Sequence, residues 1–123
     1  MHRTFLRAKI HRATVTTADL HYEGSISIDR TLCRAAGLLE FEQVDVYNIT
    51  NGSRFTTYVI YGEPGQIQIN GAAAHLAKPG DLVIIAAYCS LAPEEVPQHH
   101  SRVVLVDEKN QVASNYGKPV MQP

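Results

Sequence analysis

Two short segments of this sequence gather side chains that can do chemistry. One is His21-Tyr22-Glu23-Gly24-Ser25, which follows the basic pair Lys9 and His11, and the other runs from Asn51 to Tyr58. A serine hydroxyl lies one residue from the preceding carbonyl, and a glycine there places no side-chain obstacle to unusual dihedral angles. The Ser25 hydroxyl can therefore attack the carbonyl group of Gly24. An isolated Gly-Ser pair is more often an ordinary turn, so the residues alone leave both interpretations open.

Other common catalytic patterns are missing from the chain. There is no P-loop, GxGxxG, HExxH, CxxC or GxSxG motif, which removes the best support for nucleotide, metalloprotease and hydrolase chemistry. The six histidines, at positions 2, 11, 21, 75, 99 and 100, lack the spacing of zinc ligands. We expect no metal site.

The composition is that of a small soluble domain. The chain has 123 residues, a net charge of −1, 45% apolar residues and 19% charged residues. With a net charge this close to zero, the chain has no overall positive potential that would attract nucleic acid or anionic lipid. No apolar run approaches the roughly 20 residues of a membrane span. No targeting signal precedes the first strand pattern, and Cys33 and Cys89 form no CxxC pair. We expect a cytoplasmic protein with two free, buried thiols.

The segments that must position the reactive residues are mostly strands. A bent or bulged first strand would place Lys9 and His11 on one side, because alternate strand residues share a face. Asn51-Gly52 predicts a hairpin turn, and residues 18–24 read as a connection. The expected strands are Thr4–Thr16, Gln43–Thr50, Arg54–Tyr61, Gln66–Ile69, Leu82–Ser90 and Arg102–Asp107.

Two short helices interrupt these strands. Asp29 is a good N-cap and Gly37 a good C-terminal stop for the first helix. Asn70-Gly71 opens the second, a turn of small residues through Ala77. A weak internal sequence similarity at an offset of 38 residues aligns the two helix–turn–strand segments, which is weak evidence for a two-fold pseudo-repeat. Many short strands with two helices predict a closed β-barrel, because closure removes exposed strand edges. The rest of the tail shows little pattern.

Motifs from the N-terminus to about residue 92 resemble the bacterial aspartate 1-decarboxylase family. They include Lys9-Ile10-His11-Arg12, the HYEGS stretch at 21–25, Asn51-Gly52, Thr57-Tyr58 and the NGAAAH stretch at 70–75. The combination of HYEGS with NGAAAH is the most specific part of the resemblance. The tail from about residue 93 is poorly matched.

The resemblance implies a mainly β fold, a double-psi β-barrel with two short helices, as a single domain over residues 1–123. It also implies a homotetramer with active sites between subunits. In the family the precursor cuts itself at the bond that matches Gly24-Ser25, so we expect a proenzyme that yields fragments 1–24 and 25–123. Whether a maturation helper protein takes part is left open.

The resemblance further implies that Ser25 becomes a pyruvoyl group, which serves as the cofactor in place of pyridoxal phosphate (PLP) or a metal. Its ketone would form a Schiff base with the amine of L-aspartate and take up the electron pair as carbon dioxide leaves. The expected product is β-alanine, which the family supplies to pantothenate and coenzyme A biosynthesis.

The family's residue roles carry over to matching positions. Tyr58 matches the proton donor, and Arg54 matches the anchor of a substrate carboxylate. Thr57 would contact substrate and polarise the Gly24 carbonyl during maturation. Asn70 would support the processing site, and the substrate contacts would include Lys9, His11, Tyr22, Gly71, Ala72 and Ala73. Without the resemblance, Arg54 reads as a solvated charge and Tyr58 as a packing residue.

The alternative function is that of a non-catalytic β-barrel, an assembly or binding module. It predicts an uncleaved chain in which Ser25 and Tyr58 can be replaced without effect. Nucleic-acid binding is disfavoured by the near-neutral charge and the lack of a basic stripe. The expected partners are L-aspartate and other copies of the chain, with no nucleic acid and no membrane.

Overall fold

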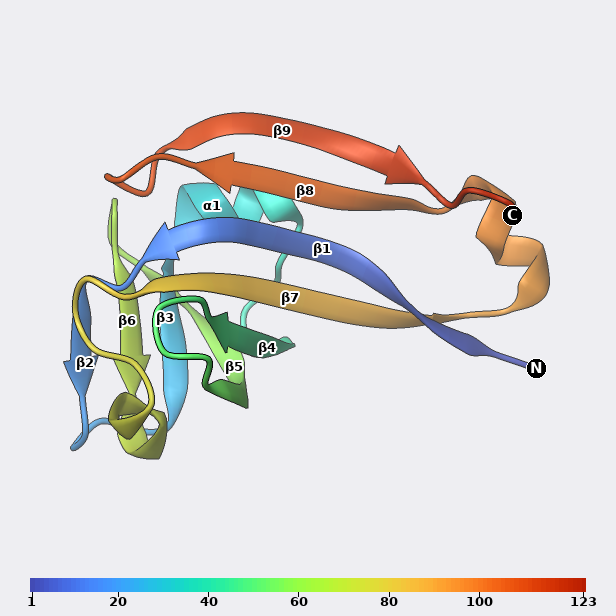
Figure 1. Cartoon of the computed structure of the whole chain (residues 1–123). Coiled ribbons are helices and arrows are strands. Elements are labelled where there is room, and N and C mark those ends of the chain that lie inside the picture. Colours follow the sequence, from blue (N-terminus) through green and yellow to red (C-terminus); the bar gives the residue numbers. More distant parts are fainter.

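The computed structural model describes residues 1–123, and most of them lie in β-strands (Figure 1). Nine strands form one hydrogen-bonded sheet in the order β2-β6-β3-β5-β4-β7-β1-β8-β9. The strands are β1 (Arg3–Thr14), β2 (Thr17–Asp19), β3 (Ser25–Asp29), β4 (Gln43–Asn48), β5 (Arg54–Gly62), β6 (Ile67–Asn70), β7 (Leu82–Leu91), β8 (His100–Val106) and β9 (Val112–Pro119). The helices are α1 (Arg30–Ala36) and the 3₁₀ helices η1 (Gly71–His75) and η2 (Pro93–Gln98).

The sheet closes on itself because β1 and β2 follow each other in the chain but lie far apart in the strand order. Around the junction, Thr16 N donates to Ile67 O at 2.8 Å, and Gly80 N donates to Val15 O at 2.8 Å. β3 runs parallel to β5 and β1 runs parallel to β8, whereas β4 and β7 pair antiparallel. The expected mainly β fold, a double-psi β-barrel, is confirmed.

The barrel interior is a cluster of 20 buried residues that includes Ile10, Ile26, Val59 and Ile85. Along β1 the buried residues alternate with half-buried Lys9 and His11, so these two share a side as predicted. The bend expected in this strand is also present. The β1–β7 register shifts twice, and at the second shift Arg12 has a φ of 66°.

Both predicted helices form, although the second ends at His75 rather than at Ala77 and the Asn70 side chain does not cap it. The Asp29 side chain accepts a hydrogen bond from Thr31 N at the start of α1, and Gly37 ends the helix in the left-handed region with a φ of 72°. η1 begins directly after Asn70, at the end of β6. The Asn51-Gly52 turn joins β4 to β5, as its sequence indicates.

Three elements were not predicted. β2 lies where a connection was expected, and η2 and β9 lie in the tail that showed little pattern. β9 is polar and largely exposed, and it pairs with β8 alone at the edge of the sheet. Backbone hydrogen bonds hold it to β8, and neither of its faces is buried in the core. Its side chains therefore need not alternate between apolar and polar, and the sequence shows no strand pattern there.

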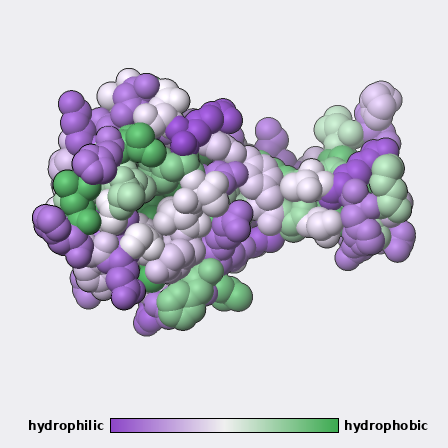
Figure 2. Space-filling view, turned by 90° about the horizontal axis from the view of Figure 1, so that it is seen from below, coloured by the Kyte–Doolittle hydropathy of each residue, from purple (hydrophilic) through white to green (hydrophobic).

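A narrow arm extends from the barrel (Figures 1 and 2). It is formed by the start of β1, the end of β7, η2, the start of β8 and the end of β9, together with the two chain ends. Cys33 is buried and Cys89 only half-buried, so the predicted burial is wrong for Cys89. Burial, with the nearby Asp29 carboxylate, raises the pKa of the Cys33 thiol to about 12. None of the helices has the length and hydrophobicity needed to cross a bilayer.

Candidate functional site

The Gly24–Ser25 peptide bond lies where the chain passes from solvent into the barrel. Gly24 is exposed, whereas Ser25 opens β3 and is only 1% exposed. The Ser25 hydroxyl donates a hydrogen bond to the Glu23 carbonyl at 2.9 Å. A buried hydroxyl thus directly follows an exposed glycine.

Asn70 holds the Ser25 hydroxyl from the neighbouring strand. The two residues face each other in the antiparallel β3–β6 pair. Asn70 Nδ2 donates to Ser25 Oγ at 3.0 Å and to Ser27 Oγ at 3.1 Å. Because Asn70 is fully buried, its amide depends on these protein partners rather than on water.

Gly71 allows the chain around Gly24 to approach η1 closely. A Cβ atom at residue 71 would lie 2.7 Å from Gly24 Cα, 2.8 Å from Gly24 N and 3.2 Å from Tyr22 O. Gly71 also has a φ of +76°, which side chains other than glycine rarely adopt. Ala72 and Ala73 continue η1, with Ala72 exposed. The NGAAAH stretch therefore lies directly against the HYEGS stretch.

Tyr58 lies on the strand next to Ser25, because β3 and β5 pair in parallel. Ile26 pairs with Val59, so Ser25 and Tyr58 occupy the preceding level of adjacent strands, about 5 Å apart in backbone spacing. The Tyr58 ring lies 6.3 Å from the ring of Phe41. An open groove of about 570 Å³ beside them is lined by Phe41, Gln43, Thr56, Thr57 and Tyr58.

Arg54 lies away from Ser25 in the same chain. It precedes Tyr58 by four residues on β5, which is about 13 Å along an extended strand. Its guanidinium stacks over the Tyr47 ring at 4.3 Å. The Tyr47 hydroxyl lies 2.6 Å from that of Tyr88, and this hydrogen bond is the main cause that raises the pKa of Tyr47 to about 12.

Lys9 and His11 also lie apart from Ser25, on β1. Lys9 pairs with Ala86 of β7, and Ala86 in turn pairs with Asp45 of β4. The β5 strand comes next in the sheet, so β7 and β4 both lie between Lys9 and β5 around the barrel. One chain thus brings the Gly24–Ser25 bond close to Tyr58 of β5, to Asn70 and to η1. It does not bring Arg54, Lys9 or His11 there.

His11 has an unusual environment for a candidate substrate contact. Its Nδ1 atom is buried and has no hydrogen-bond partner. Burial, followed by the positive charges of Lys9 and Arg12, lowers the pKa of His11 below its ordinary value. The imidazole is therefore neutral at pH 7.

Sequence reasoning missed four polar residues around these groups. Gln66 and Gln68 continue the hydrogen-bond chain from Asn70, and Tyr47 and Tyr88 hold Arg54 as described above. The polar residues at 66, 68 and 70 alternate with apolar ones, and this period of two would have identified a polar strand face. The contact between Tyr47 and Tyr88 depends on the β4–β7 register, which no local pattern reveals.

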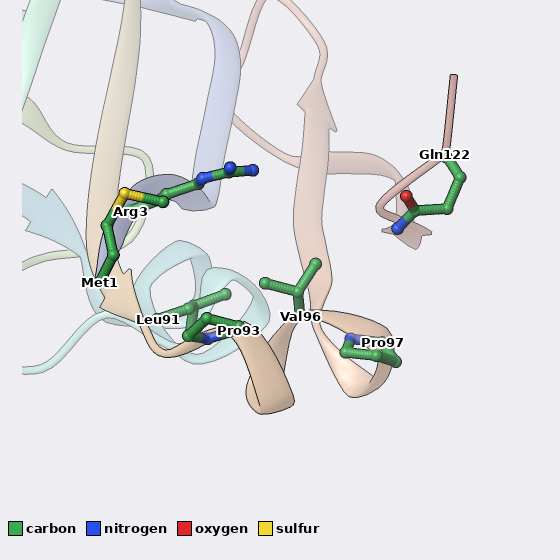
Figure 3. Close-up of a pocket in the computed structure, with 7 residues that line it drawn as sticks. All are labelled: Met1, Arg3, Leu91, Pro93, Val96, Pro97 and Gln122. Carbon is green, nitrogen blue, oxygen red and sulfur yellow. The ribbon is translucent and has the colours of Figure 1, made fainter.

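A second cavity lies on the arm, far along the molecule from β3 (Figures 1 and 3). It has a volume of about 200 Å³. Its lining residues are Met1, Arg3, Leu91, Pro93, Val96, Pro97 and Gln122 (Figure 3). None of the candidate site residues belongs to it.

Comparison with known proteins identifies the family of this chain. Residues 1–113 match the family model described as aspartate decarboxylase. The chain is 56% identical over 112 residues to the aspartate 1-decarboxylase of Hydrogenobaculum sp. strain Y04AAS1, covering 91% of this chain and 90% of that protein. It is 54% identical over 116 residues to the Clostridium acetobutylicum enzyme of the same name, covering 93% of this chain and 91% of that protein.

A third relative of that name, from Salinibacter ruber, is 57% identical over 114 residues, covering 91% of this chain and 78% of that protein. The family match spans β1 through the start of β9 and so contains every candidate site residue. With its closed barrel and the junction of HYEGS and NGAAAH, the chain belongs to the aspartate decarboxylase family.

Proposed function

We propose that this chain is a self-processing decarboxylase that converts L-aspartate to β-alanine and carbon dioxide with a pyruvoyl group made from Ser25. The observation that carries the proposal is the junction at Gly24–Ser25 in a member of the aspartate decarboxylase family. There a buried serine hydroxyl, held by Asn70, follows an exposed glycine. Family membership favours this enzyme over a non-catalytic barrel.

Self-cleavage would proceed in three balanced steps. Ser25 Oγ attacks the Gly24 carbonyl carbon, the C–N bond breaks and the hydroxyl proton passes to the nitrogen, which turns the amide into an ester. Loss of the Ser25 Cα proton then breaks the Cβ–Oγ bond and releases fragment 1–24 as a carboxylate, leaving dehydroalanine. Water replaces the α-nitrogen, which leaves as ammonia, and fragment 25–123 begins with the pyruvoyl group.

The surroundings of Ser25 fit such a group. A Cβ at residue 71 would overlap Gly24, so Gly71 keeps the space that the new chain end needs. Asn70 Nδ2 is a donor aimed at the Ser25 side chain and can hold an oxygen there after cleavage. When present, the ketone condenses with the substrate amine and accepts the electrons released with carbon dioxide.

The other residues of the chain would bind the substrate and move one proton. Arg54 would anchor the carboxylate that aspartate keeps, in a two-point contact. Backbone N–H groups at Gly71, Ala72 and Ala73 would hold the substrate at the chain end. Tyr58, level with Ser25 on the adjacent strand, would return a proton to the carbon that loses carbon dioxide. Thr57, Tyr22, Lys9 and His11 would complete the pocket.

The complete site would need more than one copy of the chain. Arg54 lies about 13 Å along β5 from the level of Ser25, and Lys9 lies on β1, four places from β3 in the strand order. This separation supports an assembly in which a second copy supplies them, and we take it to be the homotetramer that the family resemblance implies. Exposed apolar side chains such as Phe41 and Leu39, 70% and 69% exposed, are candidates for burial in that assembly. The β-alanine produced would serve pantothenate biosynthesis, and the participation of a helper protein in maturation stays open.

The experiment is an assay of purified protein with L-aspartate, in which β-alanine and carbon dioxide are both measured. The expected result is equal amounts of the two products from the unaltered chain, and none from Ser25→Ala, which lacks the nucleophile. L-Glutamate serves as a second substrate to test the length of the pocket. A Ser25→Ala protein that is as active as the unaltered chain would overturn the proposal and return the barrel to the binding-module class.

A further inference from the structure

Three side-chain amides form a continuous chain of hydrogen bonds that ends at Ser25. Gln66 Nε2 donates to Gln68 Oε1 at 3.1 Å, and Gln68 Nε2 donates to Asn70 Oδ1 at 2.7 Å. Asn70 Nδ2 then donates to Ser25 Oγ at 3.0 Å. The three residues alternate along β6 and the residue before it, so their side chains share a face of the sheet.

The direction of this chain is set at its far end by the backbone. Glu63 N donates to Gln66 Oε1 at 2.8 Å. A backbone N–H can only donate, so the oxygen of Gln66 must face it and the NH₂ group must face Gln68. The same reasoning orients Gln68 and then Asn70. Each amide in the chain has one orientation that satisfies its neighbours.

A second donor supports the middle of the chain. The Thr17 hydroxyl, on β2, donates to Gln68 Oε1 at 2.7 Å. With Gln66 and Thr17 both donating, Gln68 must present its NH₂ group to Asn70. At the near end, the two hydrogens of Asn70 Nδ2 point to the hydroxyls of Ser25 and Ser27. Asn70 therefore reaches Ser25 with a donor and never with its carbonyl oxygen.

We propose that Gln68, backed by Gln66, is a positioning residue for self-cleavage: it fixes Asn70 as a hydrogen-bond donor to the Ser25 nucleophile. The inference rests on the proposed cleavage at Gly24–Ser25. As Ser25 Oγ gives up its proton, the Asn70 N–H stabilises the negative charge that develops on the oxygen. A reversed Asn70 would offer its oxygen instead, hold the hydroxyl as a donor and repel that charge.

The test is Gln68→Glu, which keeps the size of the side chain and its acceptor for Thr17 and Gln66. The introduced carboxylate cannot donate to Asn70 Oδ1. The Asn70 amide should therefore flip, so that its NH₂ group faces residue 68 and its oxygen faces Ser25. Loss of a donor to a charged oxygen predicts cleavage slower by about 10- to 100-fold. Gln111→Glu, an exposed position with the same change in charge, is the matched control and should cleave at the unaltered rate.

Two further readouts separate positioning from a structural effect. Asn70→Ala removes the donor itself without adding a charge, so adding Gln68→Glu to it should change the cleavage rate by less than about two-fold, because both act on one contact. Lowering the pH should also bring the cleavage rate of the Gln68→Glu variant closer to the rate of the unaltered chain at the same pH. Once protonated, the introduced carboxyl group can donate to Asn70 again. Purely structural damage would give neither result.

The outcomes are distinct. Cleavage is followed by mass spectrometry of the full chain, with the melting temperature measured in parallel. If the unaltered chain cleaves and Gln68→Glu cleaves equally fast, or if the Gln68 and Asn70 effects multiply, the positioning role is overturned. If the unaltered chain never cleaves, the proposed function itself fails, whatever the Gln68 variant does.

Discussion

Ser25 and Tyr58 lie level on adjacent strands because β3 and β5 pair in parallel. Their environments differ, since Ser25 is buried and held by Asn70 whereas Tyr58 lines an open groove. At the scale of single residues this difference divides the chemistry. In the proposed reaction the serine would be consumed in making the reactive chain end, and the tyrosine would remain available to the substrate.

Tyr58→Phe tests this division. The ring still packs near Phe41, so the chain should fold and cleave at the unaltered rate. Without the hydroxyl, proton return to the product should slow, and kcat should fall by about 10²- to 10⁴-fold with little change in KM. Cleavage is checked by mass spectrometry and turnover by β-alanine formation. An unchanged kcat would remove Tyr58 as the proton donor.

At the scale of elements, the site depends on how closely η1 approaches the segment before β3. Gly71 makes that approach possible, because any side chain there would overlap the backbone of Gly24. The contact joins the end of β6 to the start of β3. The β3–β6 register, in which Ser25 pairs with Asn70, brings these two strand ends together. The position of the cleavable bond is thus a property of two paired strands rather than of the loop alone.

Gly71→Ala is expected to block or strongly slow cleavage. The left-handed conformation costs a side chain about 1–2 kcal/mol, and the new Cβ would in addition displace Gly24 from its place beside Ser25. Gly80→Ala is the matched control, because Gly80 also has a positive φ, 93°, but a Cβ there would meet no atom within 4 Å. Both variants should lose stability in denaturant unfolding, and only Gly71→Ala should cleave slowly. Equal cleavage in the two would contradict a role for the contact.

Much of this architecture could be predicted from sequence, because local signals determine it. The Asp29 and Gly37 caps and the Asn51-Gly52 turn are read from neighbouring residues. The family resemblance supplied the barrel type, and with it the roles of Ser25 and Tyr58 that are proposed here and stay predictions. β9 could not be predicted, because a polar edge strand is held by backbone hydrogen bonds.

The Gln66–Gln68–Asn70 chain and the Tyr47–Tyr88 contact were missed for another reason. Both join side chains through strand register or through partners on other strands. Register emerges only when the sheet closes, so it leaves no local pattern beyond the alternation of polar residues along β6.

At the scale of the whole molecule, the separation of Arg54 and Lys9 from Ser25 would make assembly part of the proposed mechanism. The guanidinium of Arg54 is held over Tyr47 on the outside of the barrel, and Tyr88 fixes Tyr47 in turn. A second copy of the chain could present this preformed basic group to the Ser25 end of the first. The proposed homotetramer would then repeat one composite site.

Mixed assemblies test this sharing. Ser25→Ala and Arg54→Ala should each be inactive alone, the first without the reactive group and the second without its carboxylate anchor. Unfolded together and refolded as a mixture, they should regain activity, because some sites would combine an intact Ser25 from one chain with an intact Arg54 from another. The measurement is β-alanine formation against mixing ratio. No activity above that of the separate variants would contradict shared sites.

The most direct measurement for the central claim is a denaturing mass spectrum of the purified, unaltered protein. Cleavage at Gly24–Ser25 predicts two fragments, 1–24 and 25–123, with the larger one lighter by one ammonia than a chain that begins with Ser25. The contradicting result is a single intact mass that persists after prolonged warm incubation and after treatment with an extract of the source cells. That result would mean that no pyruvoyl group forms.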